Sequence, residues 1–162
     1  MPRPRFDKLP EERRHALLQA AAEEFAAHGY DGASLNRLIE AAGVSKGSFY
    51  YYFDDKADLF STVIERSAQR IMDEIGWFSL EILGPEEFCD SILLLTRRSV
   101  AFVRRDDWWL RLARSLHHLG MNPQEAAAIR RITDFARDLW KGIIQRGQAI
   151  GVIRTDMPVD LL

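Results

Sequence analysis

The stretch AGVSKGSFYYYFDDKADLF, residues 42–60, contains the signals that decide how this chain folds. Gly43 suits the left-handed backbone conformation that ends a helix, so a helix is expected to stop there. Ser45 and Asp55 are residue types that cap helix N-termini, which predicts one helix over 46–52 and another that starts at 56. The stretch therefore predicts a helix end, a tight turn, a very short helix and the start of a long one.

The rest of the sequence predicts further helices on both sides of this stretch. Apolar residues recur at helical spacing, and no segment shows the sustained alternation of a strand. We expect helices over 10–28, 34–42, 46–52, 56–75, 86–103, 108–119 and 123–147, with Gly29 ending the first. The predicted fold class is all-α: three helices in an N-terminal domain at residues 1–55, followed by a bundle of longer helices at residues 56–162.

Composition and charge limit the classes of protein to which the chain can belong. The 162 residues include a single cysteine, Cys89, so an internal disulfide and a zinc site built on several thiolates are excluded. The N-terminus lacks the apolar core of a secretory signal, and no apolar run is long enough to span a membrane, so a cytoplasmic protein without a membrane partner is expected.

The formal net charge is −2, and residues 1–56 carry 8 Lys and Arg against 9 Asp and Glu. Any nucleic-acid site must therefore depend on where individual charges lie.

A short helix, a glycine turn and a second short helix form a helix-turn-helix unit, and residues 34–52 follow that plan. In such units the second helix enters the major groove of DNA and presents its first residues to base edges. Lys46 and Ser48 can donate hydrogen bonds there, and Gly47 allows the backbone to approach closely. The predicted DNA-binding residues are Ser34, Arg37, Ser45, Lys46, Gly47, Ser48, Tyr50, Tyr51, Tyr52 and Lys56.

Three consecutive tyrosines, Tyr50, Tyr51 and Tyr52, need an explanation of their own. Phe49 and Phe53 are four residues apart, so they share one helix face and can point to the core. The tyrosines then lie largely on the remaining faces, where a phenol hydroxyl can donate to a phosphate oxygen without adding charge. The alternative is an ordinary helical hairpin in which the tyrosines pack against neighbouring helices.

Nearly fifty contiguous residues resemble the DNA-binding domain of the TetR family of transcriptional regulators. The matching elements are F..HGY at 25–30, the pair AS at 33–34, AAGVSKGSFYYYF at 41–53 and DKADL at 55–59. Two positions depart from the family: Ile39 stands where alanine is usual, and Tyr52 where histidine is frequent. We expect Ile39 to alter the packing between the short helices and Tyr52 to replace a possible positive charge with a neutral donor.

The resemblance implies a helix-turn-helix DNA-binding domain at residues 1–55 and a helical ligand-binding and dimerisation domain at residues 56–162. It also implies residue roles and a mechanism. Tyr50 and Lys56 match positions that contact phosphate, and the positions that contact bases or backbone match Lys46, Gly47, Ser48 and Tyr51. The resemblance implies a homodimer that binds a double-stranded palindromic operator, most often as a repressor, and a small-molecule effector that shifts the two DNA-reading heads. Family members usually continue with two further helices that form the dimer interface, whereas this chain stops at GVIRTDMPVDLL. Either a truncated chain or a dimer built in another way is expected.

Aromatic residues of the C-terminal half favour an apolar or aromatic effector. The candidate pocket residues are Met72, Trp77, Phe102, Trp108, Trp109 and Trp140. Ordinary core packing explains each of them at least as well when it is taken singly. Residues 86–103 carry two apolar stripes, which predicts a helix in the middle of a bundle, with Cys89 buried and inert. The stripes are Phe88, Ile92, Leu95 and Phe102, and Cys89, Leu93, Val100 and Val103.

No catalysis, cofactor or metal is expected. The sequence has no GxSxG, no phosphate-binding loop and no HExxH. His117 and His118 are adjacent, so they would point apart on a helix and form a poor chelating pair. The helix-turn-helix pattern and the resemblance to the TetR family together predict a ligand-responsive, sequence-specific DNA-binding regulator. The alternative is a helical ligand carrier or interaction protein that keeps the fold without binding DNA.

Overall fold

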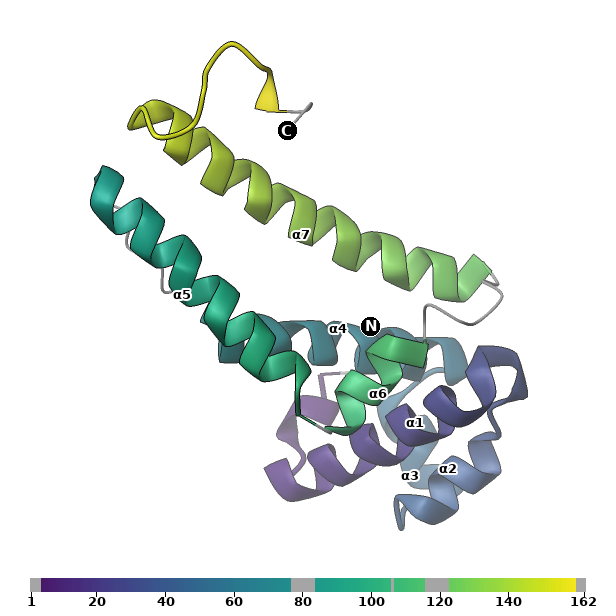
Figure 1. Ribbon diagram of the computed structural model, residues 1–162. Helices are drawn as coiled ribbons and strands as arrows, with labels where there is room; N and C mark the ends of the chain where they lie inside the picture. The colour runs from purple at the N-terminus through teal and green to yellow at the C-terminus, as the bar shows by residue number, and fades with distance from the viewer. Residues whose placement is uncertain (1–3, 77–83, 106, 116–122, 160–162) are drawn as a thin grey trace. The chain divides into compact units, whose positions relative to one another are not determined.

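The computed structural model of the chain describes residues 4–76, 84–105, 107–115 and 123–159, and every regular element in these ranges is helical (Figure 1). The elements are the 3₁₀ helix η1 (Phe6–Lys8) and the helices α1 (Glu11–Gly32), α2 (Leu35–Ala41), α3 (Lys46–Tyr52), α4 (Lys56–Ile75), α5 (Pro85–Val103), α6 (Trp108–Ser115) and α7 (Pro123–Ala149). The all-α prediction is confirmed, and α3 has the predicted bounds. None of the described helices combines the length and the apolar character needed to cross a bilayer. His117 and His118 lie outside the described residues.

Gly29 interrupts α1 instead of ending it. Its φ of 66° and ψ of 178° are not helical, and glycine adopts a positive φ without steric cost. Helical geometry then resumes as far as Gly32, and Ala33 N donates to Gly29 O at 3.1 Å. The additional turn brings the ring of Tyr30 to 5.3 Å from that of Phe60 on α4.

Two hydrogen bonds between side chains and the backbone mark the start of α4 at the predicted position. Asp58 N donates to Asp55 Oδ1 at 2.8 Å, and Asp54 N donates to Asp58 Oδ2 at 3.2 Å. The first bond satisfies a backbone donor of the first helical turn, which has no intrahelical partner, and the second connects the residue before the N-cap to the same turn. The two carboxylates also favour the positive end of the helix dipole.

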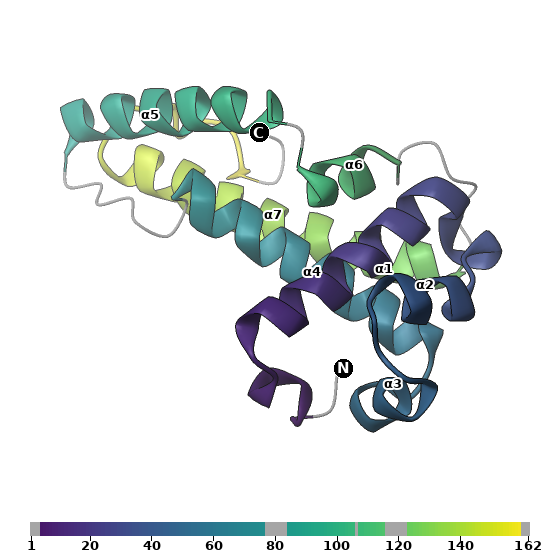
Figure 2. The same cartoon turned by 90° about the horizontal axis from the view of Figure 1, so that it is seen from below.

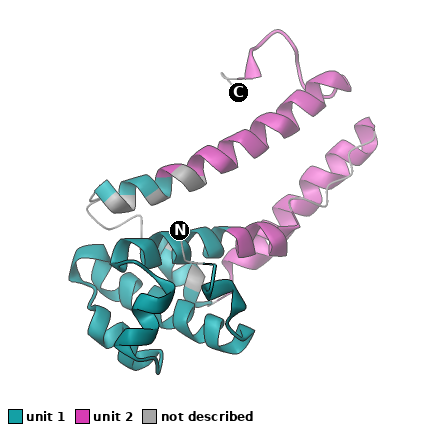
Figure 3. Cartoon of the chain, turned by 180° about the vertical axis from the view of Figure 1, so that it is seen from behind, with its two compact units in different colours: residues 1–68, 106–129 teal, residues 69–105, 130–162 magenta. Residues whose placement is uncertain are grey.

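The chain divides into two compact units (Figure 3). The first comprises residues 1–68 and 106–129, and the second comprises residues 69–105 and 130–162, so that α4 and α7 each contribute to both. The first unit extends beyond residue 55 because α4 and α6 pack on α1. Phe60 on α4 contacts Phe25 on α1 with ring centroids 4.9 Å apart, and Trp108 on α6 contacts His15 on α1 at 5.7 Å. The domain boundary expected between residues 55 and 56 stays a prediction.

Aromatic rings form the centre of the first unit. Phe25, Phe49, Phe53 and Phe60 are each at most 1% exposed. Phe49 stacks on Phe53 with ring centroids 5.5 Å apart, so the end of α3 is fixed through the side of the helix that carries these two residues. Rings of this size bury a large apolar area and prefer specific mutual geometries, so these side chains from α1, the end of α3 and α4 stabilise the first unit. Figure 2 shows the ribbons of the three helices.

In the second unit, α5 packs closely against the end of α7 at Gly147. A Cβ atom added there would lie 2.8 Å from Phe88 Cζ and 2.7 Å from Ile153 Cδ1. Phe88, Leu95 and Phe102 form a buried face of α5, which confirms one of the two predicted apolar stripes.

The second apolar stripe of α5 is exposed, which corrects the prediction that this helix lies in the middle of a bundle. Leu93, Val100 and Val103 are between 49% and 57% exposed, and Cys89 is exposed as well. The error has a physical reason: periodicity shows that two faces of a helix are apolar, but it does not show whether neighbours cover both. In the described part of the chain, only the face with Phe88, Leu95 and Phe102 is covered.

Candidate nucleic-acid interface

The turn between α2 and α3 is closed by backbone hydrogen bonds. Gly43 has a φ of 63°, Gly43 N donates to Glu40 O, and Val44 N donates to Ile39 O, both at 3.1 Å. This is the Schellman pattern, which requires a left-handed residue at the position of Gly43. The sequence signal from this glycine is therefore confirmed, and the turn sets how α3 follows α2.

Two serines begin α3. Ser48 N donates to Ser45 Oγ at 3.0 Å, and the two hydroxyl oxygens lie 2.9 Å apart. Ser45 is therefore the N-cap that the sequence predicted. Ser48 is half-buried, whereas Lys46 and Gly47 are exposed, so these two residues form the most accessible part of the first turn of α3.

Gly47 is not required by the packing of the protein itself. A Cβ added at this position would meet only Ser45 Oγ at 3.8 Å, which is an ordinary contact. Its backbone does not have the positive φ that favours glycine. A small residue at the exposed start of α3 is consistent with close approach of a partner molecule.

The three tyrosines have different surroundings. Tyr52 is half-buried, and its ring lies 6.2 Å from that of Phe6 in η1. Tyr51 is 48% exposed, and the Arg5 guanidinium lies 4.6 Å from its ring centroid. Tyr50 is 44% exposed and contacts the edge of Phe49. Packing against a neighbouring element, the alternative explanation, thus accounts for Tyr52 but leaves Tyr50 and Tyr51 on the surface.

Arg37 and Ser34 are tied to α1 by Glu24. Glu24 Oε1 accepts from Ser34 N at 2.7 Å and from Arg37 Nη2 at 2.5 Å, and Arg37 Nη2 also donates to Gly32 O at 3.2 Å. Burial alone would raise the pKa of the Glu24 carboxyl, but the hydrogen bonds from Arg37 and Ser34 and the charge of Arg37 hold this pKa below its usual value. Glu24 was not among the predicted residues, because nothing local in the sequence connects it with Arg37. The Arg37 side chain remains 54% exposed.

Lys56 is bound to the end of α1. Its Nζ donates to Tyr30 O at 2.7 Å, to Ala33 O at 3.2 Å and to Asp31 O at 3.4 Å. The ammonium also lies 4.7 Å from the centroid of the Tyr30 ring. An ammonium has three N–H donors, so these three carbonyls can occupy all of them. Lys56 therefore has a structural role in addition to the phosphate contact predicted for it.

The candidate effector residues are distributed over both compact units. Met72 and Phe102 are buried in the second unit, whereas Trp140 is 45% exposed there. Trp108 belongs to the first unit, where it contacts His15. Trp77 and the side chain of Trp109 lie outside the described residues. The pocket role of these residues stays a prediction.

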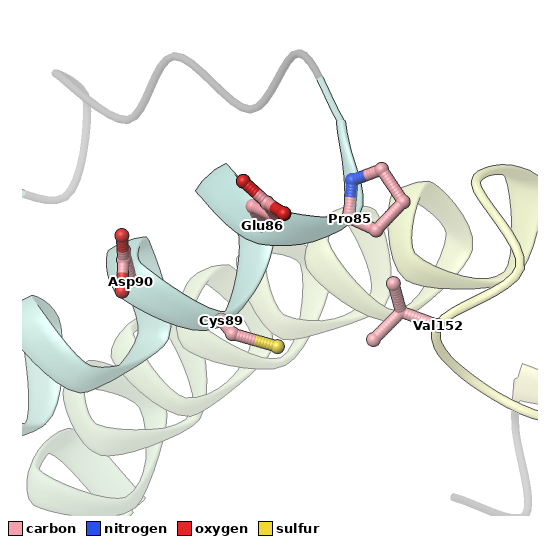
Figure 4. A pocket seen from close by; sticks show the side chains of 5 residues that line it. All are labelled: Pro85, Glu86, Cys89, Asp90 and Val152. Carbon is pink, nitrogen blue, oxygen red and sulfur yellow. The ribbon is translucent and has the colours of Figure 1, made fainter.

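A different set of residues lines a pocket of about 470 Å³ in the second unit: Pro85, Glu86, Cys89, Asp90 and Val152 (Figure 4). The Cys89 sulfur points in the direction of Val152. Over the ranges that the structure describes, no group of three or more His, Cys, Asp or Glu side chains is placed to hold a metal ion.

The comparisons with known proteins agree with this architecture. A sequence profile described as "Bacterial regulatory proteins, tetR family" matches residues 17–63. The chain is 29% identical over 153 residues to the HTH-type transcriptional repressor AcnR of Corynebacterium diphtheriae, covering 93% of this chain and 73% of that protein. Among solved structures, Salmonella enterica GusR superposes with a TM-score of 0.72 at 25% identity, over 95% of this chain and 78% of that one. FadR from Bacillus subtilis, solved in complex with stearoyl-CoA, superposes with a TM-score of 0.66 at 22% identity, over 91% and 77% of the two chains, and this likeness concerns the fold alone.

The capped helix-turn-helix, its exposed α3 and the helical C-terminal half define an all-α transcriptional regulator that binds DNA. Residues 17–63 match the TetR family of bacterial regulatory proteins, and the chain is similar over most of its length to the repressor AcnR and to GusR.

Proposed function

We propose that the chain binds double-stranded DNA as a homodimer and represses transcription, with α3 of each copy in the major groove of one half of a palindromic operator. The observation that carries this proposal is the exposed side of α3. Lys46, Gly47, Tyr50 and Tyr51 are exposed there, while buried Phe49 and Phe53 fix the helix from the other side. A two-fold dimer contacts two half-sites that are one helical turn of DNA, or a multiple of it, apart.

The proposed residue roles follow from exposure and chemistry. Lys46 and Ser48 contact base edges, because they open the helix that enters the groove. Tyr50 and Arg37 contact phosphates, which fix the register of the protein on DNA without reading sequence. Ser34 and Ser45 act as helix caps that place these groups, since their hydroxyls accept from Arg37 N and from Ser48 N.

We also propose an apolar or aromatic small molecule as the effector. Two observations support it: Met72 and Phe102 are buried in the second unit, and the FadR of Bacillus subtilis, which shares the fold, binds stearoyl-CoA. Because α4 is one uninterrupted helix with residues in both units, a ligand that displaces its second half also acts on the half that packs against the helix-turn-helix.

The test of DNA binding is selection of duplexes from a random pool with the purified chain. A symmetric consensus is expected, and its half-sites give the operator. Recovery of no enriched sequence from a folded protein that still binds apolar compounds would favour the alternative, a helical ligand carrier.

The test of the effector class is a titration of acyl-CoAs and aromatic compounds, monitored by tryptophan fluorescence and by release from the selected operator. Apolar compounds are expected to change both signals. Release by polar metabolites or metal ions alone would show that the proposed effector class is wrong.

A further inference from the structure

The segment that precedes α1 is attached to the helix-turn-helix unit by a buried aromatic side chain. Phe6 is 0% exposed, and its ring lies 4.9 Å from that of Phe53 and 6.2 Å from that of Tyr52. Leu9 N donates to Phe6 O at 3.1 Å, which closes the single turn of η1. Burial of one phenylalanine contributes a large apolar area for so short a segment. Residues 5–8, called the N-terminal arm below, are therefore held beside α3.

Polar contacts to two other helices hold the N-terminal arm as well. Arg14 on α1 donates from Nη1 to Asp7 O at 3.1 Å, and Arg66 on α4 forms an ion pair with the Asp7 carboxylate. The arm thus contacts α1, α3 and α4. Its position relative to α3 is set by packing inside the first unit and does not depend on a bound partner.

This position places Arg5 on the exposed part of α3. The Arg5 guanidinium lies 4.6 Å from the centroid of the Tyr51 ring, and Tyr51 is 48% exposed. Arg5 is exposed too. A guanidinium that stacks on an aromatic face keeps its N–H groups available at its edge, where they match the geometry of a phosphate. Stacking also reduces the conformational freedom that the side chain loses on binding.

The charges near the helix-turn-helix make such a cation important. Residues 1–56 have 8 basic and 9 acidic residues, a formal charge of −1. Two of the eight cations already have strong partners: Arg37 is paired with Glu24, and Lys56 with three carbonyls. Electrostatic attraction to DNA depends on cations that can approach phosphates. Arg5 and Lys46 are exposed cations beside and on α3.

We propose that Arg5 is a DNA-binding residue, which contacts a backbone phosphate at the edge of the major groove that α3 occupies, with Tyr51 as the platform that orients it. This inference rests on the proposed DNA-binding function. It also assigns Tyr51 a role different from that of Tyr50, since the Tyr51 ring supports a cation and the Tyr50 hydroxyl itself approaches the DNA.

The experiment compares Arg5→Ala with Arg13→Ala in the full chain. Both variants remove one positive charge, but Arg13 lies in the first turn of α1 and not beside Tyr51. Binding to the selected operator and to a random 30-base-pair duplex is measured by fluorescence anisotropy at several salt concentrations. We expect Arg5→Ala to weaken binding about tenfold on both duplexes and to lower the salt slope by about 0.9, the value for one phosphate contact. Arg13→Ala should keep the wild-type slope.

A double-mutant cycle with Tyr51→Leu tests the platform. If Tyr51 acts through Arg5, the losses in Arg5→Ala and Tyr51→Leu will add to more than the loss in the double variant. Thermal unfolding is the control for folding, and Arg5→Ala is expected to match the wild type because Arg5 is exposed.

The outcomes separate this inference from the function on which it rests. Failure of the wild-type chain to bind either duplex would reject the proposed function. Wild-type binding with equal affinities and slopes for Arg5→Ala and Arg13→Ala would reject the role of Arg5. A loss seen only when A·T pairs flank the half-site would overturn the phosphate contact in favour of minor-groove reading.

Discussion

Tyr50, Tyr51 and Tyr52 show how residues of one type acquire different roles within a single turn of helix. Tyr52 contacts Phe6, and the Tyr51 ring lies beneath the Arg5 guanidinium. Tyr50 presents an exposed ring beside Phe49. A phenol serves all three positions because its body is apolar and its single polar group lies at the tip. The consequences of substitution should therefore differ from one tyrosine to the next.

Tyr50→Phe is expected to weaken DNA binding without changing folding. The substitution removes the hydroxyl and leaves the contact of the ring with Phe49 in place. A hydrogen bond to a charged acceptor contributes roughly 1.5–3 kcal/mol, so affinity should fall about tenfold or more. The loss should be the same for operator and scrambled duplexes, because phosphates carry no sequence information. A loss confined to the operator would show that Tyr50 reads a base instead.

Lys56→Met should destabilise the fold. Methionine keeps most of the aliphatic chain but leaves the carbonyls of Tyr30, Asp31 and Ala33 without the ammonium donor. We expect a loss of about 1–3 kcal/mol in the free energy of unfolding, measured with urea. A further fall of about 0.9 in the salt slope of DNA binding would show that Lys56 also contacts phosphate. An unchanged free energy of unfolding would contradict the structural role.

At the scale of the element, the connection between α1 and α2 depends on one carboxylate. Glu24 on α1 is only 10% exposed, and it accepts from the backbone at the start of α2 and from Arg37 within α2. The hydrogen bonds from Arg37 and Ser34 therefore hold α2 on α1, and with it the turn that leads to α3.

Glu24→Gln should destabilise the protein near neutral pH and flatten its acid unfolding. The pKa of Glu24 is lowered on folding, so its contribution to stability is complete above the unfolded value of about 4.5 and is lost as pH falls through the lower folded value. Glutamine has no such titration. Urea unfolding of both proteins between pH 3 and pH 7 provides the measurement. If the free energies of unfolding of the wild type and of Glu24→Gln differ by the same amount at every pH, Glu24 adds no pH-dependent stability.

Two glycines of α7 offer a matched comparison of packing. An added Cβ meets nothing within 4 Å at Gly142, so Gly142→Ala should stabilise the helix by up to about 1 kcal/mol. At Gly147 the same methyl group would lie within 2.8 Å of Phe88 and Ile153, and overpacking costs about 1–3 kcal/mol. Gly147→Ala should therefore unfold at lower urea concentration than Gly142→Ala. Equal midpoints would show that Phe88 and Ile153 move aside easily.

At the scale of the whole molecule, exposed apolar side chains are unevenly distributed. In the described ranges, the large apolar side chains exposed in the first unit are Tyr50 and Tyr51, both on α3. Those exposed in the second unit are Leu93, Leu94, Val100, Val103, Phe135, Trp140 and Val152. Four of them, Leu93, Leu94, Val100 and Val103, lie on α5, and a contiguous apolar patch on a protein surface is typical of an interaction site. We expect the dimer that the proposed function needs to cover these α5 side chains with a second copy.

Leu93→Glu should weaken dimerisation. The substitution places a charge in the middle of the exposed face of α5, and burial of an unpaired charge in an interface is strongly unfavourable. Sedimentation at micromolar concentration is the measurement, with Gln145→Glu on the exposed surface of α7 as the charge-matched control. Wild-type dimer affinity in Leu93→Glu would place the interface elsewhere.

The sequence alone determined the elements whose signals are local. Ser45, Asp55 and Gly43 act through hydrogen bonds and backbone conformations within a few residues, so the bounds of α3 and the start of α4 could be predicted from residue type and spacing. The burial of Phe49 and Phe53 followed from their spacing of four residues. The order of these signals over residues 25–59 was enough to indicate the family.

Only the tertiary structure decided which distant side chains meet. The pairs Arg5–Tyr51, Glu24–Arg37 and Lys56–Tyr30 join residues 46, 13 and 26 positions apart. Their contacts depend on how buried rings orient the helices, and no local pattern encodes that orientation. The exposed side of α5 has the same origin: an apolar stripe shows what a helix can bury, but the neighbours that pack against it determine what is buried.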